Sequence, residues 1–326
     1  MAASRALVLT GLAVALVTGC VVGVAFGTTN LEASTLLKAL FTDSGDPAVD
    51  VIVRSLRAPR VVAAMVAGAC LGAAGSLLQS ATRNPLGDPQ LFGLGGGAAI
   101  VQALALAGVV TVGPWGLTSL SVLAALAGAL LIFLLASREN LTPARLALIG
   151  VSMGALTLAI AGAILTHARV FSLQALALFS GSLANRSWED VMPAIPFLAL
   201  GIVLAVLAAG RLNLLVLGDR LAGHLGASPK TTRFMALASA GVLAGAGVAL
   251  AGVVGFVGLL TPHVVRLLMG SDARTVMAVS VPTGALVVLY SDQVSRLAFM
   301  PSEIPVGLVT TVLGAPLMIW VARRIL

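Results

Sequence analysis

Long apolar runs separated by short polar segments organise this chain almost from end to end. Runs of about 17 to 25 residues have the length of helices that cross a bilayer, and they predict ten spans. The spans cover residues 6–26, 60–79, 91–110, 115–136, 144–166, 191–209, 231–250, 253–269, 275–295 and 305–322. The pattern therefore predicts an all-α, polytopic membrane protein with one transmembrane domain over residues 1–326.

One polar segment between two spans has a pattern of its own. Residues 211–233 read RLNLLVLGDRLAGHLGASPKTTR, and within them Leu217, Leu221 and Leu225 recur every four positions. This spacing places the three leucines on one face of a helix of about two turns. Because so short a helix cannot span a membrane, we expect it to lie along the surface and to offer its apolar edge to a partner protein.

Composition and charge support this interpretation. The 326 residues are 59% hydrophobic and 10% charged, and the mean hydropathy is +1.08. The net charge of +7 gives no reason to expect a nucleic-acid partner, because in a membrane protein only the placement of Lys and Arg around the spans is informative. If both termini are cytoplasmic, the inner segments carry 12 of the 19 basic residues. The positive-inside rule favours this orientation, with residues 211–233 in the cytoplasm.

The N-terminal apolar run has two possible interpretations. Val17, Thr18, Gly19 and Cys20 resemble a lipoprotein processing site, but the run continues to Phe26 and reaches the length of a span. A spanning helix is the favoured interpretation and a cleaved lipoprotein signal the alternative. The two cysteines, Cys20 and Cys70, both lie in apolar runs, so the sequence predicts neither a disulfide framework nor a metal site.

Small residues indicate how the spans pack. Helices in lipid associate through close backbone approach, and Gly68-x-x-x-Gly72 and Gly241-x-x-x-Gly245 each give a helix a smooth face. Both faces fit generic packing; the alternative for the first is a central helix contacted on several sides. Prolines inside three spans predict kinked or broken helices in the C-terminal half, at Pro262, Pro282 and Pro316.

The sequence contains no motif for catalysis or for nucleotide binding. The two lysines, Lys38 and Lys230, do not follow a glycine, so the chain has no phosphate-binding loop of the type G-x-x-x-x-G-K-[ST]. Ion-coupled carriers need ionisable groups within the membrane, and Asp292 is the only carboxylate in the predicted spans. We therefore do not expect the chain to be an enzyme. We expect the energy for transport to come from a partner protein bound at residues 211–233.

Three regions together resemble a known family. Residues 57–98, RAPRVVAAMVAGACLGAAGSLLQSATRNPLGDPQLFGLGGGA, resemble the second and third spans of the FecCD-type permeases of ABC importers, which include siderophore, haem and vitamin B12 permeases. Residues 217–226 are similar to the cytoplasmic L-G-[DE]-x-x-A-x-x-L-G segment of that family, and residues 255–316 to its C-terminal signature. The resemblance runs essentially from end to end.

The resemblance implies a type II ABC importer permease fold in the cytoplasmic (inner) membrane. It implies a second permease subunit, identical or paralogous, two ABC ATPase subunits that bind ATP and Mg²⁺, and an extracytoplasmic substrate-binding protein. No cofactor or metal is expected in this chain. Residues 211–230 would form the ATPase-coupling segment, with its contacts at Leu217, Gly218, Asp219, Arg220, Leu221, Ala222, Leu225 and Gly226.

Two further sites follow from the resemblance. Arg57, Arg60 and Arg296 match positions whose arginines pair with glutamates of the binding protein, a task that suits the guanidinium fork; snorkelling at the membrane interface is the alternative. Thr142 and Arg145, near the inner end of the fifth span, would lie at a cytoplasmic gate.

The cargo is the least determined feature. A pathway with few charges suits a bulky chelate, and a ferric siderophore is favoured over haem and vitamin B12 because siderophore permeases are common in the family. A stand-alone ion-coupled carrier is the alternative from another functional class.

Overall fold

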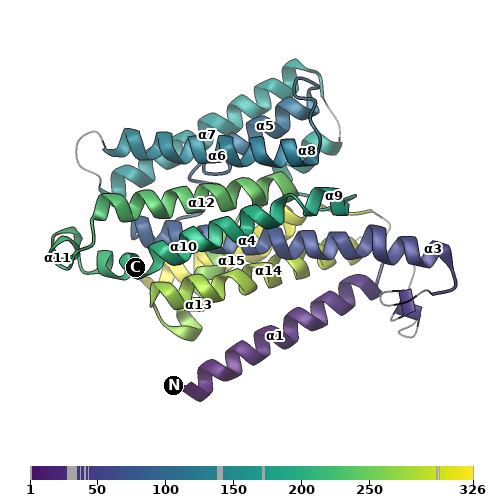
Figure 1. Cartoon of the computed structure of the whole chain (residues 1–326), viewed down its shortest axis with the longest axis horizontal. Helices are drawn as coiled ribbons and strands as arrows, with labels where there is room; N and C mark the ends of the chain where they lie inside the picture. The colour runs from purple at the N-terminus through teal and green to yellow at the C-terminus, as the bar shows by residue number, and fades with distance from the viewer. Residues whose placement is uncertain are drawn as a thin grey trace.

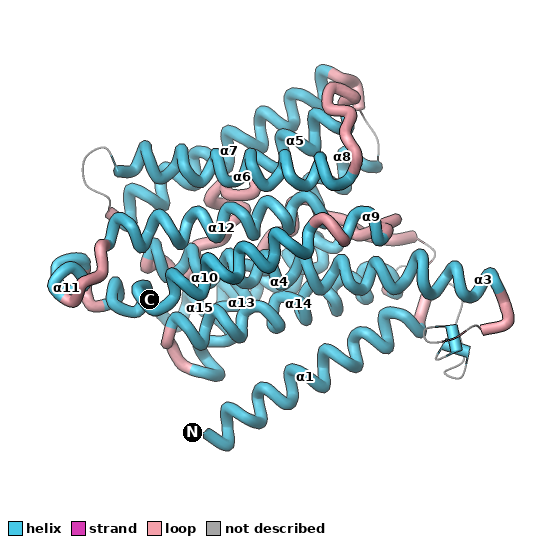
Figure 2. Tube along the Cα trace, in the orientation of Figure 1, coloured by secondary structure: helices cyan, strands magenta, loops and turns pink. Residues whose placement is uncertain are grey.

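The chain folds into a bundle of helices in the computed structural model, which describes residues 2–27, 35–36, 38–39, 42, 44–137, 142–170, 173–298, 300 and 302–325. No strand occurs within these ranges, so the all-α prediction is confirmed (Figures 1 and 2). The elements are α1 (Ala2–Ala25), α3 (Pro47–Asp50), the π-helical η1 (Val51–Arg57), α4 (Ala58–Thr82), α5 (Gly96–Leu106), α6 (Pro114–Ser137), α7 (Pro143–His167), α8 (Leu173–Ser180), α9 (Trp188–Val191), α10 (Ala194–Val216), α11 (Asp219–His224), α12 (Pro229–Ala251), α13 (Val257–Met269), α14 (Ala273–Leu297) and α15 (Val306–Ile325).

Helices occupy all ten predicted span positions, but three of their apolar segments are short. Seven segments in the described residues are long and apolar enough to cross a membrane, and three shorter apolar helices, Gly96–Leu106, Val257–Met269 and Val306–Trp320, occupy the other predicted positions. Helix α1 extends past Cys20 to Ala25, as expected for a spanning helix. The helices α13, α14 and α15 continue through their internal prolines, so these prolines do not break them.

Two of the short helices begin late because the chain before them is not helical. Gly93 has φ 70° and Phe256 has φ 67°, which is left-handed backbone that ends a regular helix. The segment around Gly93 packs directly on the backbone of Gly154 in α7. Non-helical backbone is tolerated at membrane depth only where protein covers it, and neighbouring helices supply that cover here.

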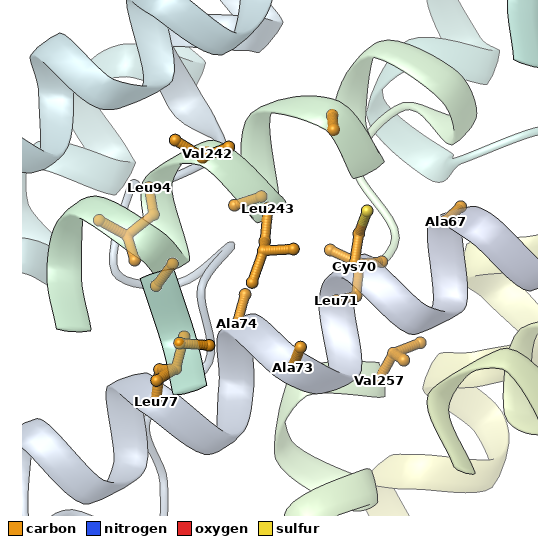
Figure 3. Close-up of a cluster of buried hydrophobic side chains, with 14 of the residues drawn as sticks. Ala67, Cys70, Leu71, Ala73, Ala74, Leu77, Leu94, Val242, Leu243 and Val257 are labelled. Atoms are coloured by element: carbon orange, nitrogen blue, oxygen red, sulfur yellow. The ribbon is translucent and has the colours of Figure 1, made fainter. Parts of the chain in front are cut away.

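Helix α4 is the centre of the bundle. It contacts α10, α12, α13 and α14, and nearly all of its side chains are buried. In Figure 3, Leu243 of α12 points toward α4 near Ala74, and Val257 at the start of α13 lies on another side of α4. In contrast, large apolar side chains on the outer helices remain exposed, among them Leu148 and Leu156 of α7, as expected where lipid replaces water.

Glycines give α4 its close contacts. A Cβ atom on Gly68 would overlap the backbone of Gly284 in α14, and a Cβ atom on Gly75 would overlap the backbone of Gly258 in α13. Since backbone atoms cannot move aside as a flexible side chain can, α4 approaches both helices only where it lacks a side chain. The alternative of a central helix contacted on several sides is thus the correct one for the first glycine motif.

We expect Gly68→Ala to destabilise the purified chain by roughly 1–3 kcal/mol, the usual cost of overpacking. Gly11→Ala is the matched control, because a Cβ atom at Gly11 meets nothing within 4 Å. The measurement is the thermal unfolding midpoint of each variant in detergent. Equal midpoints for Gly68→Ala and Gly11→Ala would show that α4 and α14 do not approach as closely as described.

Candidate functional site

A short helix with an exposed apolar edge lies at one end of the bundle. Helix α11 follows α10 after Gly218, whose φ of 105° turns the chain out of the preceding helix. Leu217, Leu221 and Leu225 are 55%, 56% and 58% exposed. The predicted exposed edge is confirmed, although the helix itself is shorter than expected, because Leu217 and Leu225 flank it. In Figure 1, α11 and both chain termini lie toward the left, opposite α3 and α9.

Ion pairs hold this helix to the bundle. Asp219, the first residue of α11, accepts two hydrogen bonds from Arg233 of α12, with Nη1 to Oδ2 at 2.8 Å and Nη2 to Oδ1 at 2.9 Å. Arg83, at the C-terminal end of α4, donates from Nη2 to Oδ1 at 2.5 Å. The Arg233 side chain is only 1% exposed, and its Nε donates to the carbonyl oxygen of Ala81 in α4.

These contacts connect the exposed leucines to the central helix. Burial alone would raise the pKa of Asp219, but the Arg233 and Arg83 guanidiniums outweigh this effect and hold the pKa below its usual value. The carboxylate therefore stays charged at neutral pH and keeps both partners. Asp219 thus ties the start of α11 to the end of α4 and to the start of α12. No pattern in the sequence indicates this arrangement, because Arg83 is 136 positions from Asp219.

A second charged cluster lies at the end of the bundle away from α11. Arg60 of α4 donates from Nη2 to Asp292 Oδ1 at 2.9 Å and to Glu303 Oε2 at 2.9 Å. Arg296 Nε lies 3.4 Å from Asp292 Oδ2. The Asp292 side chain is 1% exposed, whereas the Glu303 side chain is 43% exposed. The buried carboxylate of Asp292 thus pairs with two arginines, and the more exposed carboxylate of Glu303 is a second partner of Arg60.

The same cluster receives the end of α1. Arg57 Nη1 donates to the carbonyl oxygens of Val24 at 2.9 Å and Ala25 at 2.8 Å, and Arg296 Nη2 donates to that of Gly23 at 3.1 Å. The last carbonyl groups of a helix lack partners within the helix and carry partial negative charge, so cations suit this position. The structure brings Arg57, Arg60 and Arg296 together as expected, but their guanidiniums contact acceptors within the chain. Their docking role stays a prediction.

The two predicted gate residues form a helix cap. Thr142 precedes α7, and its Oγ1 accepts a hydrogen bond from the backbone N–H of Arg145 at 3.3 Å. This contact fixes the start of α7. The preceding residues 138–141 lie outside the described part of the chain, and the gate stays a prediction.

Residues of the motif region 57–98 also fix the start of α13. Gln79 Nε2 donates to the carbonyl oxygens of Gly258 at 3.1 Å and Leu259 at 3.3 Å, and Gln79 Oε1 accepts from Arg266. Asp88 is buried, and its Oδ1 accepts from the backbone N–H of Gln90 at 2.8 Å. These polar side chains satisfy the backbone where helices are interrupted, which is a structural task.

A cavity of about 730 Å³ opens beside the arginine cluster. It is lined by apolar residues of α5, α6 and α8 together with polar side chains, those of Gln102, Gln174, Ser182, Asn185, Arg186, Asp190 and Glu303. Glu303 therefore faces both this cavity and Arg60. Among the described residues, no group of three or more His, Cys, Asp or Glu side chains could hold a metal ion.

Comparisons with known proteins agree on one family. The sequence pattern of the FecCD transport family matches residues 10–324. The chain is 34% identical over 298 residues to the Fe(3+)-citrate import system permease protein YfmD of Bacillus subtilis (strain 168), covering 91% of this chain and 89% of that protein. It is 38% identical over 280 residues to the vitamin B12 import system permease protein BtuC of Vibrio cholerae, covering 84% of this chain and 83% of that protein.

A solved structure has the same fold. It is described as a metal-chelate type ABC transporter in an inward-facing conformation, and it superposes with a TM-score of 0.82 at 27% sequence identity. The match covers 97% of this chain and 99% of the other.

Proposed function

This chain belongs to the FecCD transport family, and we propose that it is the transmembrane permease subunit of an ATP-driven importer for a bulky iron chelate, most simply a ferric siderophore. It is a multi-pass membrane protein of the ABC importer permease type. In this proposal it catalyses no bond change. ATP hydrolysis takes place in separate ATPase subunits, and cargo passes between this chain and a second permease subunit.

The observation that carries the proposal is the braced, exposed edge of α11. Three leucines more than half exposed are costly next to water and become favourable inside an apolar cleft of a partner. Asp219 links this edge to α4 and α12 through Arg83 and Arg233. An ATPase bound at residues 211–230 can thereby move the core of the bundle rather than a loose loop.

The proposed orientation of the chain in the membrane follows from the distribution of its basic residues. Both termini and α11 lie toward one end in Figure 1, and this end also carries Arg83, Arg211, Arg233 and Arg274. Lys and Arg are concentrated in the cytoplasmic segments of membrane proteins, so we place this end in the cytoplasm. The arginine cluster and the 730 Å³ cavity then face the binding protein outside.

The cargo is proposed from chemistry that several chelates share. The cavity combines apolar walls with amide side chains and with the guanidinium of Arg186 beside two carboxylates, and its amide and guanidinium donors suit a large ligand with amide, hydroxamate or carboxylate oxygens. Relatives of similar identity are named for iron(III) citrate, for hemin and for vitamin B12, so haem and vitamin B12 are the alternatives. A stand-alone ion-coupled carrier is disfavoured because Asp292, the carboxylate in α14, is already paired with two arginines.

The test is reconstitution into vesicles. We expect uptake of labelled ferric chelate only when the chain is combined with its ATPase, its binding protein and ATP. Haem and cobalamin serve as competing cargoes in the same assay. Uphill transport by the purified chain alone would overturn the proposal, and preferential uptake of haem or cobalamin would replace the siderophore as cargo.

We propose that the binding protein docks at Arg60, where one of its carboxylates replaces Glu303 as the partner of the guanidinium. Asp292 is buried and fixed between Arg60 and Arg296, whereas Glu303 is 43% exposed and can be replaced by a carboxylate of the docking protein. We therefore expect Glu303→Gln to strengthen docking several-fold at low salt, because it frees one side of the Arg60 guanidinium for a charge-assisted pair. The measurement is the Kd of the binding protein at two salt concentrations.

Glu189→Gln is the control for this change. Glu189 is exposed in the first turn of α9, and its substitution alters the net charge by the same amount without touching the arginines. Equal Kd values for the two variants would show that the stronger docking comes from the change in net charge and not from Arg60. Unchanged or weaker docking of Glu303→Gln at low salt would contradict the exchange.

A further inference from the structure

A groove that the proposed function does not use runs between α10 and α14. It has a volume of about 750 Å³ and apolar walls formed by Val206 and Leu207 of α10 and by Met277 and Ala278 of α14. Val206 and Leu207 are each 58% exposed, so the groove faces outward, away from the core. Both walls belong to helices long and apolar enough to cross a membrane, so an outward-facing groove between them would meet lipid in a bilayer.

Two arginines lie at one end of the groove. Arg211 belongs to the last turns of α10, and Arg274 is the second residue of α14; both line the cavity. The Arg274 guanidinium lies across the backbone of α10 at Gly210, where a Cβ atom would come within 2.6 Å of Nη2. The absence of a side chain at Gly210 thus lets Arg274 bend over the groove.

Within the described part of the chain, neither arginine has a counter-charge bound to it. Among the residues that the structure describes, Arg211 and Arg274 take part in no ion pair; the polar contact of Arg211 is the Met235 thioether, 3.4 Å from Nη1. Asp272 influences Arg274 electrostatically, but its oxygens already accept hydrogen bonds from Asn213 and from the backbone and hydroxyl of Thr275.

We propose that this groove binds an anionic phospholipid. The phosphate group would pair with Arg211 and Arg274, and an acyl chain would lie along the apolar walls. Guanidinium groups form strong charge-assisted hydrogen bonds with phosphate, and basic pockets between membrane helices on the cytoplasmic side recognise anionic headgroups. The two arginines lie at the ends of spanning helices, at the depth where headgroups are found.

The position of the groove gives the lipid a consequence. Helix α10 leads directly through Leu217 into α11, and Asn213, one turn beyond Gly210, is bonded to Asp272 and to the backbone N–H of Ala273. A phospholipid that neutralises Arg211 and Arg274 would hold the ends of α10 and α14 together next to the coupling segment.

The choice of a lipid over a soluble anion rests on the walls. A free phosphate or phosphate ester could pair with the arginines, but it would leave the apolar groove uncovered. A phospholipid covers both parts, and it is already present at high local concentration in the membrane.

The experiment is native mass spectrometry of the purified full chain with phosphatidylglycerol or phosphatidylcholine of identical acyl chains. We expect phosphatidylglycerol to be retained roughly 10- to 30-fold more strongly, the effect of two basic residues near an anionic headgroup. Arg211→Ala/Arg274→Ala should lose this preference. Lys230→Ala, which removes an exposed charge near the same end but outside the groove, should keep it.

A second variant tests the apolar walls. Ala278→Trp fills the groove from an exposed position without altering charge, and it should weaken retention of both lipids. Equal retention of the two lipids by the unmodified chain, or an unchanged preference in Arg211→Ala/Arg274→Ala, would overturn the proposal. Displacement of phosphatidylglycerol by glycerol 3-phosphate at similar concentration would also overturn it, because the headgroup alone would then account for binding.

Discussion

Leu221→Asp combined with Leu225→Asp should abolish co-purification of the ATPase subunit with this chain. Both leucines are more than half exposed in the isolated chain, so the substitutions remove little packing within the bundle. In the assembly we propose, they would place two unpaired carboxylates in an apolar cleft. Each unpaired polar group that is buried costs on the order of several kcal/mol. The two carboxylates together should therefore lower the affinity for the ATPase by a factor of more than about 10³.

The measurement is the ATPase recovered when the tagged chain is purified, together with the thermal unfolding midpoint of the chain. The midpoint should not change. His224→Asp is the control, because it adds a carboxylate to α11 at an exposed position outside the leucine edge. Intact assembly after the double change would refute the coupling role of residues 211–230, and an equal loss with His224→Asp would attribute binding to charge rather than to the leucines.

Asp292→Asn should cost the folded chain about 3–5 kcal/mol, the usual effect of leaving buried charges without their partner. The Asp292 side chain is 1% exposed and lies between Arg60 and Arg296, which are 12% and 8% exposed. Without the carboxylate, Arg296 loses its ion-pair partner and Arg60 keeps the more exposed Glu303, in a site that water barely reaches. We expect a strongly lowered unfolding midpoint and a large aggregated fraction in detergent.

Two further variants separate this effect from a general loss of polarity. Glu303→Gln removes a carboxylate from the same cluster at a more exposed position and should change the midpoint little. Arg296→Gln added to Asp292→Asn should recover part of the lost stability, since it removes the guanidinium that lost its counter-charge. A midpoint for Asp292→Asn equal to that of Glu303→Gln would show that Asp292 is not the buried counter-charge described.

The sequence predicted the helices well but not all of their lengths. Apolar length alone placed α6, α7 and α12 to within a few residues of their observed ends. It extended the third span to residues 91–110 although α5 covers Gly96–Leu106. Hydropathy cannot distinguish a helix from apolar chain that turns at Gly93, because the turn depends on the backbone of Gly154 in another helix.

The sequence predicted which residues belong to the candidate sites, but it did not predict the contacts that these residues make. The four-residue spacing of Leu217, Leu221 and Leu225 indicated an exposed edge, which is a local property of the chain. Sequence reasoning treated Arg57, Arg60 and Arg296 as surface charges. Asp292 is only four positions from Arg296, but the contacts that Arg60 makes with Asp292 and Glu303, and Arg57 with the end of α1, join residues far apart in sequence.

What the chain determined by itself was therefore the set of spans, the glycine face of α4 and the leucine edge of α11, because the length and spacing of apolar residues act within one helix. Only the tertiary structure decided which charges are neutralised: Asp219 by Arg83 and Arg233, and Arg60 by Asp292 and Glu303. The reason is that an ion pair depends on a separation of a few ångströms in space, and folding creates that separation between residues that the sequence keeps apart.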